Sequence, residues 1–441
     1  MAASHLGVVS VKLGSNSNDQ PNQPPPIRSV GPNPIQIGST HPLLRAMQPP
    51  KARRRRRRRR RRSPRRRPRP SPQLVDDAIS EILLRLPPDD PSCLARASAV
   101  CRTWRRVLAE PAFAARYRAL HWTPPVLGSF LHDAAFVPTT AFRPPAADYP
   151  DSLVVDCRHG RVLLEDRNSE DLAVWDPITG VLHRLPKVPD FISFNCNSAV
   201  LCAAAGAGCG HLDCHGGPFV VALLGDGRSP GRQIHACLYS SETGAWSAHA
   251  SIELDPIELD SYYTSCLTVD VVPAALVGDA LYFIGDFGNE ILRYDLVDPI
   301  LSVVDPPDVD ISYDGVVVMP EEDGGLGFAV LKLYHLYLWS MDTGPDGDAG
   351  WANHRVINLE TMLPPCNLEP VLSGFVESAN AIVVTSDIAV FTIELKSLRI
   401  RKVCKRDEAY CGFLYTGFFI PVCASGRLPS LVASGELSDL L

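Results

Sequence analysis

The chain has 441 residues, of which 45% are hydrophobic and 21% charged, an ordinary composition for a protein of two or three globular domains. Its net charge of −6 conceals an asymmetry: fifteen of the 43 Lys and Arg residues lie within residues 51–69, whereas residues 71–441 hold 25 basic and 48 acidic residues. Such an acidic body is not expected to bind nucleic acid by general attraction to phosphate, and the sequence has no run of about 18 apolar residues that would span a membrane.

Residues 1–70 are predicted to be disordered, because residues 1–50 are rich in Pro, Asn, Gln and Ser and poor in groups that form a core. Residues 53–62 are ten consecutive arginines within a polybasic run at 51–69, whose like charges keep it extended. Two interpretations of this run stay open: a nuclear import signal or an arm for nonspecific nucleic-acid binding, and a spacer without a selected role.

The expected location is the nucleus or the cytoplasm. The apolar run at residues 8–13 is too short for a signal-peptide core and no small-residue cleavage pattern follows it. Without a secretion signal, the thirteen cysteines are expected to be reduced thiols.

Residues 71–122 are predicted to form a small helical module. Ile79, Ile82, Leu83 and Leu86 are spaced as one apolar face of a helix, which Pro87 and the proline after it end. Three more helices are expected: the first begins at an Asp90 N-cap followed by Pro91 and holds Leu94, Ala97 and Ser98 on one side; the second begins near Cys101 and turns Trp104, Val107 and Leu108 inward; the third begins at Pro111 and holds Phe113 and Tyr117. So few helices bury too little apolar area to be stable alone, so the module is expected to lean on a partner or a neighbouring domain.

The order of residues in this module resembles the F-box, the motif that attaches substrate receptors to the Skp-family adaptor of cullin-RING ubiquitin ligases. The matching positions are Leu74, Asp77, Ile82, Leu83, Leu86, Pro87, Leu94, Val100, Cys101, Trp104 and Phe113. Val75 stands where the family usually has proline. The resemblance implies an adaptor-binding surface that includes Leu74, Ile79, Ile82, Leu83, Leu86, Pro87, Leu94, Val100, Cys101 and Trp104. The alternative interpretation is an ordinary helical cap on the domain that follows.

From residue 123 the pattern changes to short apolar runs separated by Gly, Asp and Pro, which is typical of β-strands. The clearest unit is residues 153–186, in which four strands alternate with turns, one of them at His159-Gly160. Its third strand recurs along the chain with an aromatic residue at about the same place, at an average spacing of about 54 residues. These aromatic residues are Trp175, Tyr239, Tyr294, Trp339 and Phe391.

These repeats predict a β-propeller over residues 123–425, followed by a tail at 426–441. Five units, with a sixth assembled from residues 126–136 and 412–422, indicate six blades whose termini pair to close the ring. An irregular β-sandwich is the alternative. The pattern from Val174 to Gly180 and at Leu185-Pro186 also resembles the F-box-associated β domains of plant receptors. The fold class is therefore α+β and multidomain, a helical F-box followed by an all-β domain.

Residues 196–215 contain the densest group of potential metal ligands, and Cys209, His211, Cys214 and His215 supply four donors. Their spacing is not that of a paired knuckle, and four donors within seven residues rarely converge on one ion without a second, distant pair. We interpret the stretch as a glycine-rich loop between blades and predict no metal or cofactor, with a zinc site as the alternative.

The combined prediction is a substrate receptor of an SCF-type ubiquitin ligase that performs no bond chemistry itself. Its expected partners are the Skp-family adaptor, cullin through that adaptor, and a protein substrate, with the Arg-rich arm as a candidate for nonspecific nucleic-acid binding. The alternative is a propeller scaffold with a polybasic arm that binds RNA or protein without ubiquitin transfer. No phosphate-binding loop, His-Glu-x-x-His pair or nucleophile elbow is present in the sequence, and a propeller enzyme with dispersed carboxylates is the remaining, less favoured interpretation.

Overall fold

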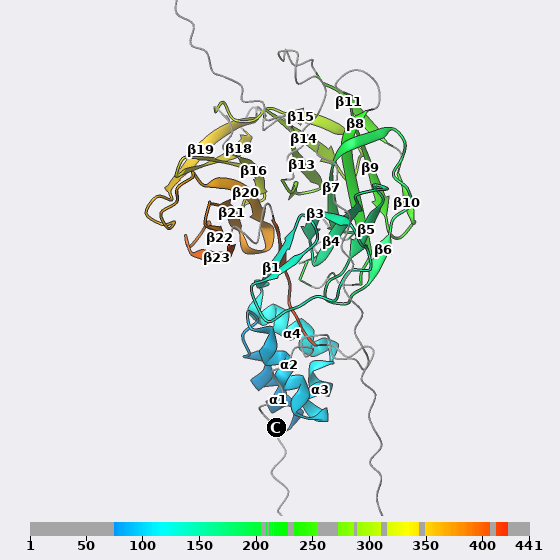
Figure 1. Ribbon diagram of the computed structural model, residues 1–441, viewed down its shortest axis with the longest axis vertical. Helices are drawn as coiled ribbons and strands as arrows, with labels where there is room; N and C mark the ends of the chain where they lie inside the picture. Colours follow the sequence, from blue (N-terminus) through cyan, green and yellow to red (C-terminus); the bar gives the residue numbers. More distant parts are fainter. Residues whose placement is uncertain are drawn as a thin grey trace, which may run out of the picture. The chain divides into compact units, whose positions relative to one another are not determined.

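The computed structural model describes residues 75–203, 209, 211–212, 214, 216–227, 233–247, 249–254, 272–285, 289–309, 315–343, 349–405 and 412–421, without the side chains of residues 193–196, 343 and 349. Within these ranges four α-helices are followed by six antiparallel sheets (Figure 1). Contacts between Cα atoms group residues 70–441 into one compact unit. The predicted disordered segment with its polybasic run, Leu74 and the predicted tail lie outside the described residues. No helix in the described part of the chain is long and apolar enough to cross a membrane.

The first helix, α1 (Asp76–Leu84), is shorter than the apolar spacing predicts, and one of its predicted inward residues points outward. It ends at Arg85, whose backbone N–H bonds back to Ile82, so Leu86 and Pro87 lie in the following turn. The inward face consists of Ile79, Leu83 and Leu84, whereas Ile82 is exposed. The buried stripe therefore follows residues four and five apart, and the expectation that Ile82 shares the buried face is wrong.

The other helices agree with the predicted caps. They are α2 (Pro91–Val100), α3 (Arg102–Leu108) and α4 (Pro111–His121). The side chain of Asp90 accepts a hydrogen bond from the Ser92 N–H at 3.1 Å, and Pro91 takes the first helical position. The buried positions are the predicted Leu94, Ala97, Ser98, Val107, Leu108, Phe113 and Tyr117, with Trp104 half-buried.

The six sheets form the predicted six-bladed β-propeller. Five of them take their strands from one stretch of chain each: β3 (Ser152–Arg158), β4 (Arg161–Asp166), β5 (Leu172–Trp175) and β6 (Leu182–Arg184); β7 (Ile192–Cys202), β8 (Phe219–Gly227), β9 (Gln233–Ser240), β10 (Ala245–Trp246) and β11 (Ala250–Glu253); β12 (Ala275–Val277), β13 (Ala280–Gly285), β14 (Glu290–Asp295) and β15 (Leu301–Val304); β16 (Val316–Pro320), β17 (Leu326–Lys332), β18 (His335–Thr343) and β19 (Ala349–Asn358); β20 (Val371–Val376), β21 (Ala381–Thr385), β22 (Ala389–Glu394) and β23 (Ile400–Lys405). The recurring aromatic residues all lie on the third strands of these blades: β5, β9, β14, β18 and β22. The predicted turn at His159-Gly160 is confirmed by positive φ angles of 51° and 75°, as a type I′ hairpin requires.

The sixth sheet joins the two ends of the propeller. It consists of β1 (Val126–Leu131), β2 (Phe136–Pro138) and β24 (Gly412–Thr416), in the order β2-β1-β24. The pairing of β1 with β24 is antiparallel, with Phe130 opposite Phe413. Apolar clusters fill the interface between every neighbouring pair of sheets, including the pair on either side of this one. The predicted closure is confirmed, although the strand ends at Thr416 and so covers only the first part of the predicted range 412–422.

The segment after β24 connects the propeller to the helices. Phe418 and Ile420 belong to the apolar cluster of the helical module, whereas Phe419 belongs to the cluster between β1 and the first complete blade. Successive side chains of an extended segment point to opposite sides, so one short stretch of chain serves both cores. The Phe418 ring lies edge-on to the Tyr117 ring with centroids 6.1 Å apart. The module therefore leans on the propeller, as its small apolar area requires.

Candidate functional site

Some of the predicted adaptor-binding residues are buried inside the helical module, and the others are exposed on its surface. Ile79, Leu83 and Leu94 are buried in the core of the module, and Leu86 and Trp104 pack against that core. Pro87 and Cys101 are exposed, as are Ile82 and Val100, whose exposed fractions are 44% and 62%. The exposed residues are available to a partner, whereas the buried residues pack the helices together and so fix the positions of the exposed ones.

Polar contacts fix the helices around this core. The Tyr117 hydroxyl donates to the carbonyl of Leu86 at 2.8 Å and so holds the turn after α1, and burial raises the pKa of that hydroxyl well above its usual value. His121 bonds to the carbonyl of Leu84 at 2.9 Å. Ion pairs join Arg106 to Asp76 and Arg116 to Glu81, all largely exposed, so they contribute little. The module is thus a preformed surface held mainly by apolar packing.

The propeller contains a cavity of about 330 Å³ beside the inner strands of three of its blades. The inner strands β3, β20 and β24 contribute to its wall, together with Trp122 from the segment after α4 and His211 from the loop between β7 and β8. Arg158 enters this cavity at the end of β3, where its guanidinium donates to the carbonyl of Ala274 and lies 3.3 Å from the carboxylate of Glu377. The ion pair crosses between blades and rigidifies the wall of the cavity.

Asp156 is fully buried beside this ion pair. Its carboxylate accepts a hydrogen bond from the backbone N–H of Val200 at 2.8 Å, which joins β3 to β7 of the next blade. Burial raises the pKa of Asp156, and the nearby Arg158 opposes that effect. Sequence reasoning missed Asp156, Arg158 and Glu377. The available signal was that Asp156 and Arg158 occupy inward positions in the strict alternation of β3, where apolar residues are expected.

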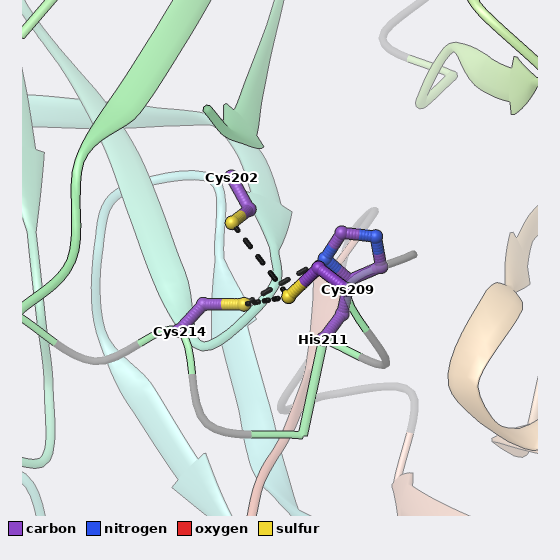
Figure 2. A group of neighbouring side chains, drawn as sticks. All are labelled: Cys202, Cys209, His211 and Cys214. Atoms are coloured by element: carbon purple, nitrogen blue, oxygen red, sulfur yellow. Dashed lines mark hydrogen bonds between the residues drawn. The ribbon is translucent and has the colours of Figure 1, made fainter. Parts of the chain in front are cut away.

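Four thiol and imidazole groups converge where the β7–β8 loop meets the end of β7. The side chains of Cys202, Cys209, His211 and Cys214 point toward one another, and their ligand atoms all lie within 4.8 Å of each other (Figure 2). Of the predicted four donors, three take part, while His215 lies outside the described residues and Cys202 joins from the strand. The loop connects two strands of the same sheet, so its interpretation as a loop between blades is wrong.

The electrostatic surroundings of this cluster differ from one thiol to the next. A hydrogen bond from the backbone of His211 lowers the pKa of the Cys209 thiol, whereas burial raises the pKa of Cys214. Burial also lowers the pKa of His211 and brings that of His159 to about 2, so both imidazoles are neutral near pH 7. Their rings stack with centroids 3.8 Å apart, and Nδ1 of His159 accepts a hydrogen bond from the backbone N–H of Cys202 at 3.2 Å.

Two parts of the chain match known protein families. Residues 72–114 match the model described as the F-box domain, and residues 153–415, more than half of the chain, match the model described as F-box protein AT5G49610-like, beta-propeller. No curated protein matches the chain.

Several solved structures share a distant likeness. The PQQ-bound aldose sugar dehydrogenase from Streptomyces coelicolor is 13% identical with a TM-score of 0.33, over 65% of this chain and 88% of that one. The WD40 domain of SCAP from fission yeast is 14% identical with a TM-score of 0.33, over 59% of this chain and 54% of that one. YCF48 bound to D1 peptide is 8% identical with a TM-score of 0.34, over 64% of this chain and 82% of that one. At these scores the likenesses support no argument about activity.

Proposed function

Since this chain belongs to the family of F-box proteins with an AT5G49610-like β-propeller, we propose that it is the substrate-recognition subunit of an SCF-type cullin-RING ubiquitin ligase. In this role the helical module binds a Skp-family adaptor, and through it cullin, while the propeller binds the protein to be modified. The observation that carries the proposal is a packed F-box module that leaves apolar side chains on its surface, among them Ile82 and Val100. Such side chains on the surface of an F-box module are candidates to be buried against the adaptor, where a few residues carry most of the binding free energy.

The proposed mechanism is proximity. The receptor holds its substrate close to a ubiquitin-loaded enzyme and so raises the effective concentration of the reacting groups, which belong to other subunits. Such a subunit needs rigidity between its two binding surfaces, because a fixed geometry limits where the substrate can be presented. Packing of Phe418 and Ile420 into the helical core supplies a rigid connection. This architecture fits a non-catalytic subunit.

The propeller face that points away from the helices is the proposed site for the substrate. α4 leads into β1, and the segment after β24 returns to the helices, so the ends of the inner strands mark the helical face. Because neighbouring strands are antiparallel, connections between second and third strands lie on the opposite face. Among the described residues these connections include 167–171, 333–334 and 386–388. They carry the exposed apolar side chains of Leu333 and Ile388.

The adaptor assignment is tested by co-expressing the full chain with a Skp-family adaptor and cullin and measuring recovery and affinity. Ile82→Ala and Val100→Ala are each expected to weaken adaptor binding by about 1–2 kcal/mol, roughly 5- to 30-fold, without changing the melting temperature. Val297→Ala is the matched control, because Val297 is also apolar and exposed but lies on the propeller. Recovery of the chain without adaptor and cullin, bound instead to RNA, would favour the polybasic scaffold.

The substrate assignment is tested by proximity labelling with the proteasome blocked. A Leu333→Ser, Ile388→Ser double variant is expected to lose labelled proteins that the parent chain labels, while adaptor binding stays intact. Val297→Ser serves as the control, because its turn follows a third strand and lies toward the helical face. An unchanged set of labelled proteins would move the substrate site away from these loops.

A further inference from the structure

The Cys202, Cys209, His211 and Cys214 cluster has the dimensions of a metal site. Sγ of Cys202 lies 4.0 Å from Sγ of Cys209, Sγ of Cys209 lies 3.7 Å from Sγ of Cys214, and Sγ of Cys214 lies 3.6 Å from Nδ1 of His211. Tetrahedral zinc with Zn–S bonds of about 2.3 Å and Zn–N bonds of about 2.0–2.1 Å places two sulfurs about 3.8 Å apart and a sulfur and nitrogen about 3.6 Å apart. These three of the six ligand–ligand separations match the edges of such a tetrahedron, and the other three are at most 4.8 Å.

We propose that Cys202, Cys209, His211 and Cys214 bind one structural zinc ion. Three cysteines and one histidine form a closed tetrahedral set that leaves no position for substrate, which is typical of structural sites. Four donors within seven residues of one loop rarely converge on a single ion, but this set includes Cys202, which is seven residues before Cys209. Cys202 is the last residue of β7, so one ligand comes from a strand and the other three come from the loop that follows it (Figure 2).

The surroundings complement the charge of such a site. Zinc with three thiolates and one neutral imidazole carries one net negative charge, and binding releases the three thiol protons to solvent. The Arg161 side chain is buried, and its guanidinium donates to the carbonyls of Cys214 and Gly217. It therefore places a positive charge beside the thiolates and fixes the loop backbone that carries Cys214. The stacked ring of His159 covers His211, which limits the ways the ligand imidazole can turn.

A disulfide explains the cluster less well than zinc. Disulfide sulfurs lie about 2.05 Å apart, whereas the two sulfur–sulfur separations here are 3.7 and 4.0 Å, and the four cluster members converge together instead of forming a pair. Thiolate and imidazole donors in a tetrahedral arrangement select zinc over calcium or magnesium, which prefer oxygen.

The position of the zinc loop gives the ion a structural consequence. His211 and Leu212 line the cavity of about 330 Å³, and Leu212 also packs against the apolar core of the helical module. A zinc ion that holds the loop closed therefore fixes one wall of the cavity and one of the contacts between the helices and the propeller. Loss of the metal is expected to loosen this contact as well as the loop itself.

The test uses the full chain purified without chelator. Elemental analysis is expected to find about one zinc per chain, and X-ray absorption is expected to show three sulfur ligands and one nitrogen ligand. After replacement by cobalt, intense visible d–d bands and sulfur-to-cobalt charge transfer report tetrahedral thiolate coordination. Chelation is expected to lower the melting temperature. These readouts use the unmutated chain, so they do not depend on a variant that folds.

Variants then assign the ligands. Cys209→Ser and His211→Ala are expected to lose most of the bound zinc, whereas His211→Cys retains it and shifts the cobalt spectrum toward four-sulfur coordination. Cys366→Ser is the matched control and keeps its zinc, because Cys366 lies outside the cluster and its thiol bonds to the carbonyl of Pro364. A folded parent chain that binds less than a tenth of an equivalent of zinc when zinc is supplied would overturn the proposal. So would equal zinc content in the parent, Cys209→Ser and His211→Ala chains.

Discussion

Replacing Phe418 by alanine tests whether the helical module depends on the propeller. Phe418 is 2% exposed and lies in the core of the module, with its ring edge-on to Tyr117. Removal of a buried phenylalanine side chain costs about 3–5 kcal/mol, part of which is the aromatic contact. That loss is a large fraction of the stability of a typical domain, about 5–15 kcal/mol, so the small module is expected to open while the larger propeller stays folded.

Native-state hydrogen exchange measures the opening of the helical module separately from the opening of the propeller. A loss of 3–5 kcal/mol raises the population of the open module by about two to four orders of magnitude, and amides of α4 should exchange faster by that factor. Amides of the third strands of the blades should keep their protection.

Phe419→Ala is the matched control for this experiment. Phe419 is buried beside Phe418 but packs between β1 and the first complete blade. Its replacement should accelerate exchange in β1 and β4 more than in α4. If Phe418→Ala left α4 protected within tenfold of the parent chain, the module would be stable without this contact and the argument that it leans on the propeller would be refuted.

Other changes test the remaining parts of the chain. A chain that ends before Cys411 loses β24 and the segment after it, whose six buried apolar side chains at 413–415 and 418–420 are worth about 1.5–3 kcal/mol each, so it should aggregate or lose its cooperative melt; an unchanged melting temperature would argue against a closed ring. Leu83→Ala removes a fully buried side chain and should cost about 2–5 kcal/mol of module stability, read by exchange in α1, with weaker adaptor binding as a result; unchanged stability and binding would contradict its place in the core. Burial raises the pKa of Glu165 to about 7, so the folded state loses stability as pH rises from the ordinary 4.5 toward 7; Glu165→Gln should be more stable than the parent above pH 7 by up to about 3 kcal/mol and equal to it below pH 4.5, in denaturation curves taken across that range. Deletion of residues 51–70 should leave the melting temperature and adaptor binding unchanged and alter only nuclear import or RNA retention, followed with a fluorescent fusion; a lost cooperative melt would show that the run is structural.

Local chemistry in the sequence was sufficient to predict most of the secondary structure. The caps at Asp90 and Pro91, the turn at His159-Gly160 and the aromatic residues of the third strands each depend on neighbours within a few residues, so the spacing of residue types specifies them. Ring closure was also predictable, because the apolar C-terminal segment needs a partner and β1, which pairs with β2 along one edge, offers its other edge to β24.

The tertiary structure decided what each apolar or polar residue contacts. Ile82 and Leu83 have the same chemical character, yet one is exposed and the other buried, because consecutive helical residues point about 100° apart and only one of them faces the side of α1 that packs against α3 and α4. Phe418 and Phe419 likewise pack into two different apolar cores, because successive side chains of an extended segment point to opposite sides. The proposed zinc ligands show the same limit most clearly: the four donors grouped by sequence spacing did not include Cys202, which joins Cys209, His211 and Cys214 because β7 pairs with β8 and its end lies beside the intervening loop. The spacing of residue types along the chain determines helices, strands and turns, because these depend on neighbours a few residues apart. Contacts between separate helices and strands form only when the sheets pack, so the sequence pattern does not specify them.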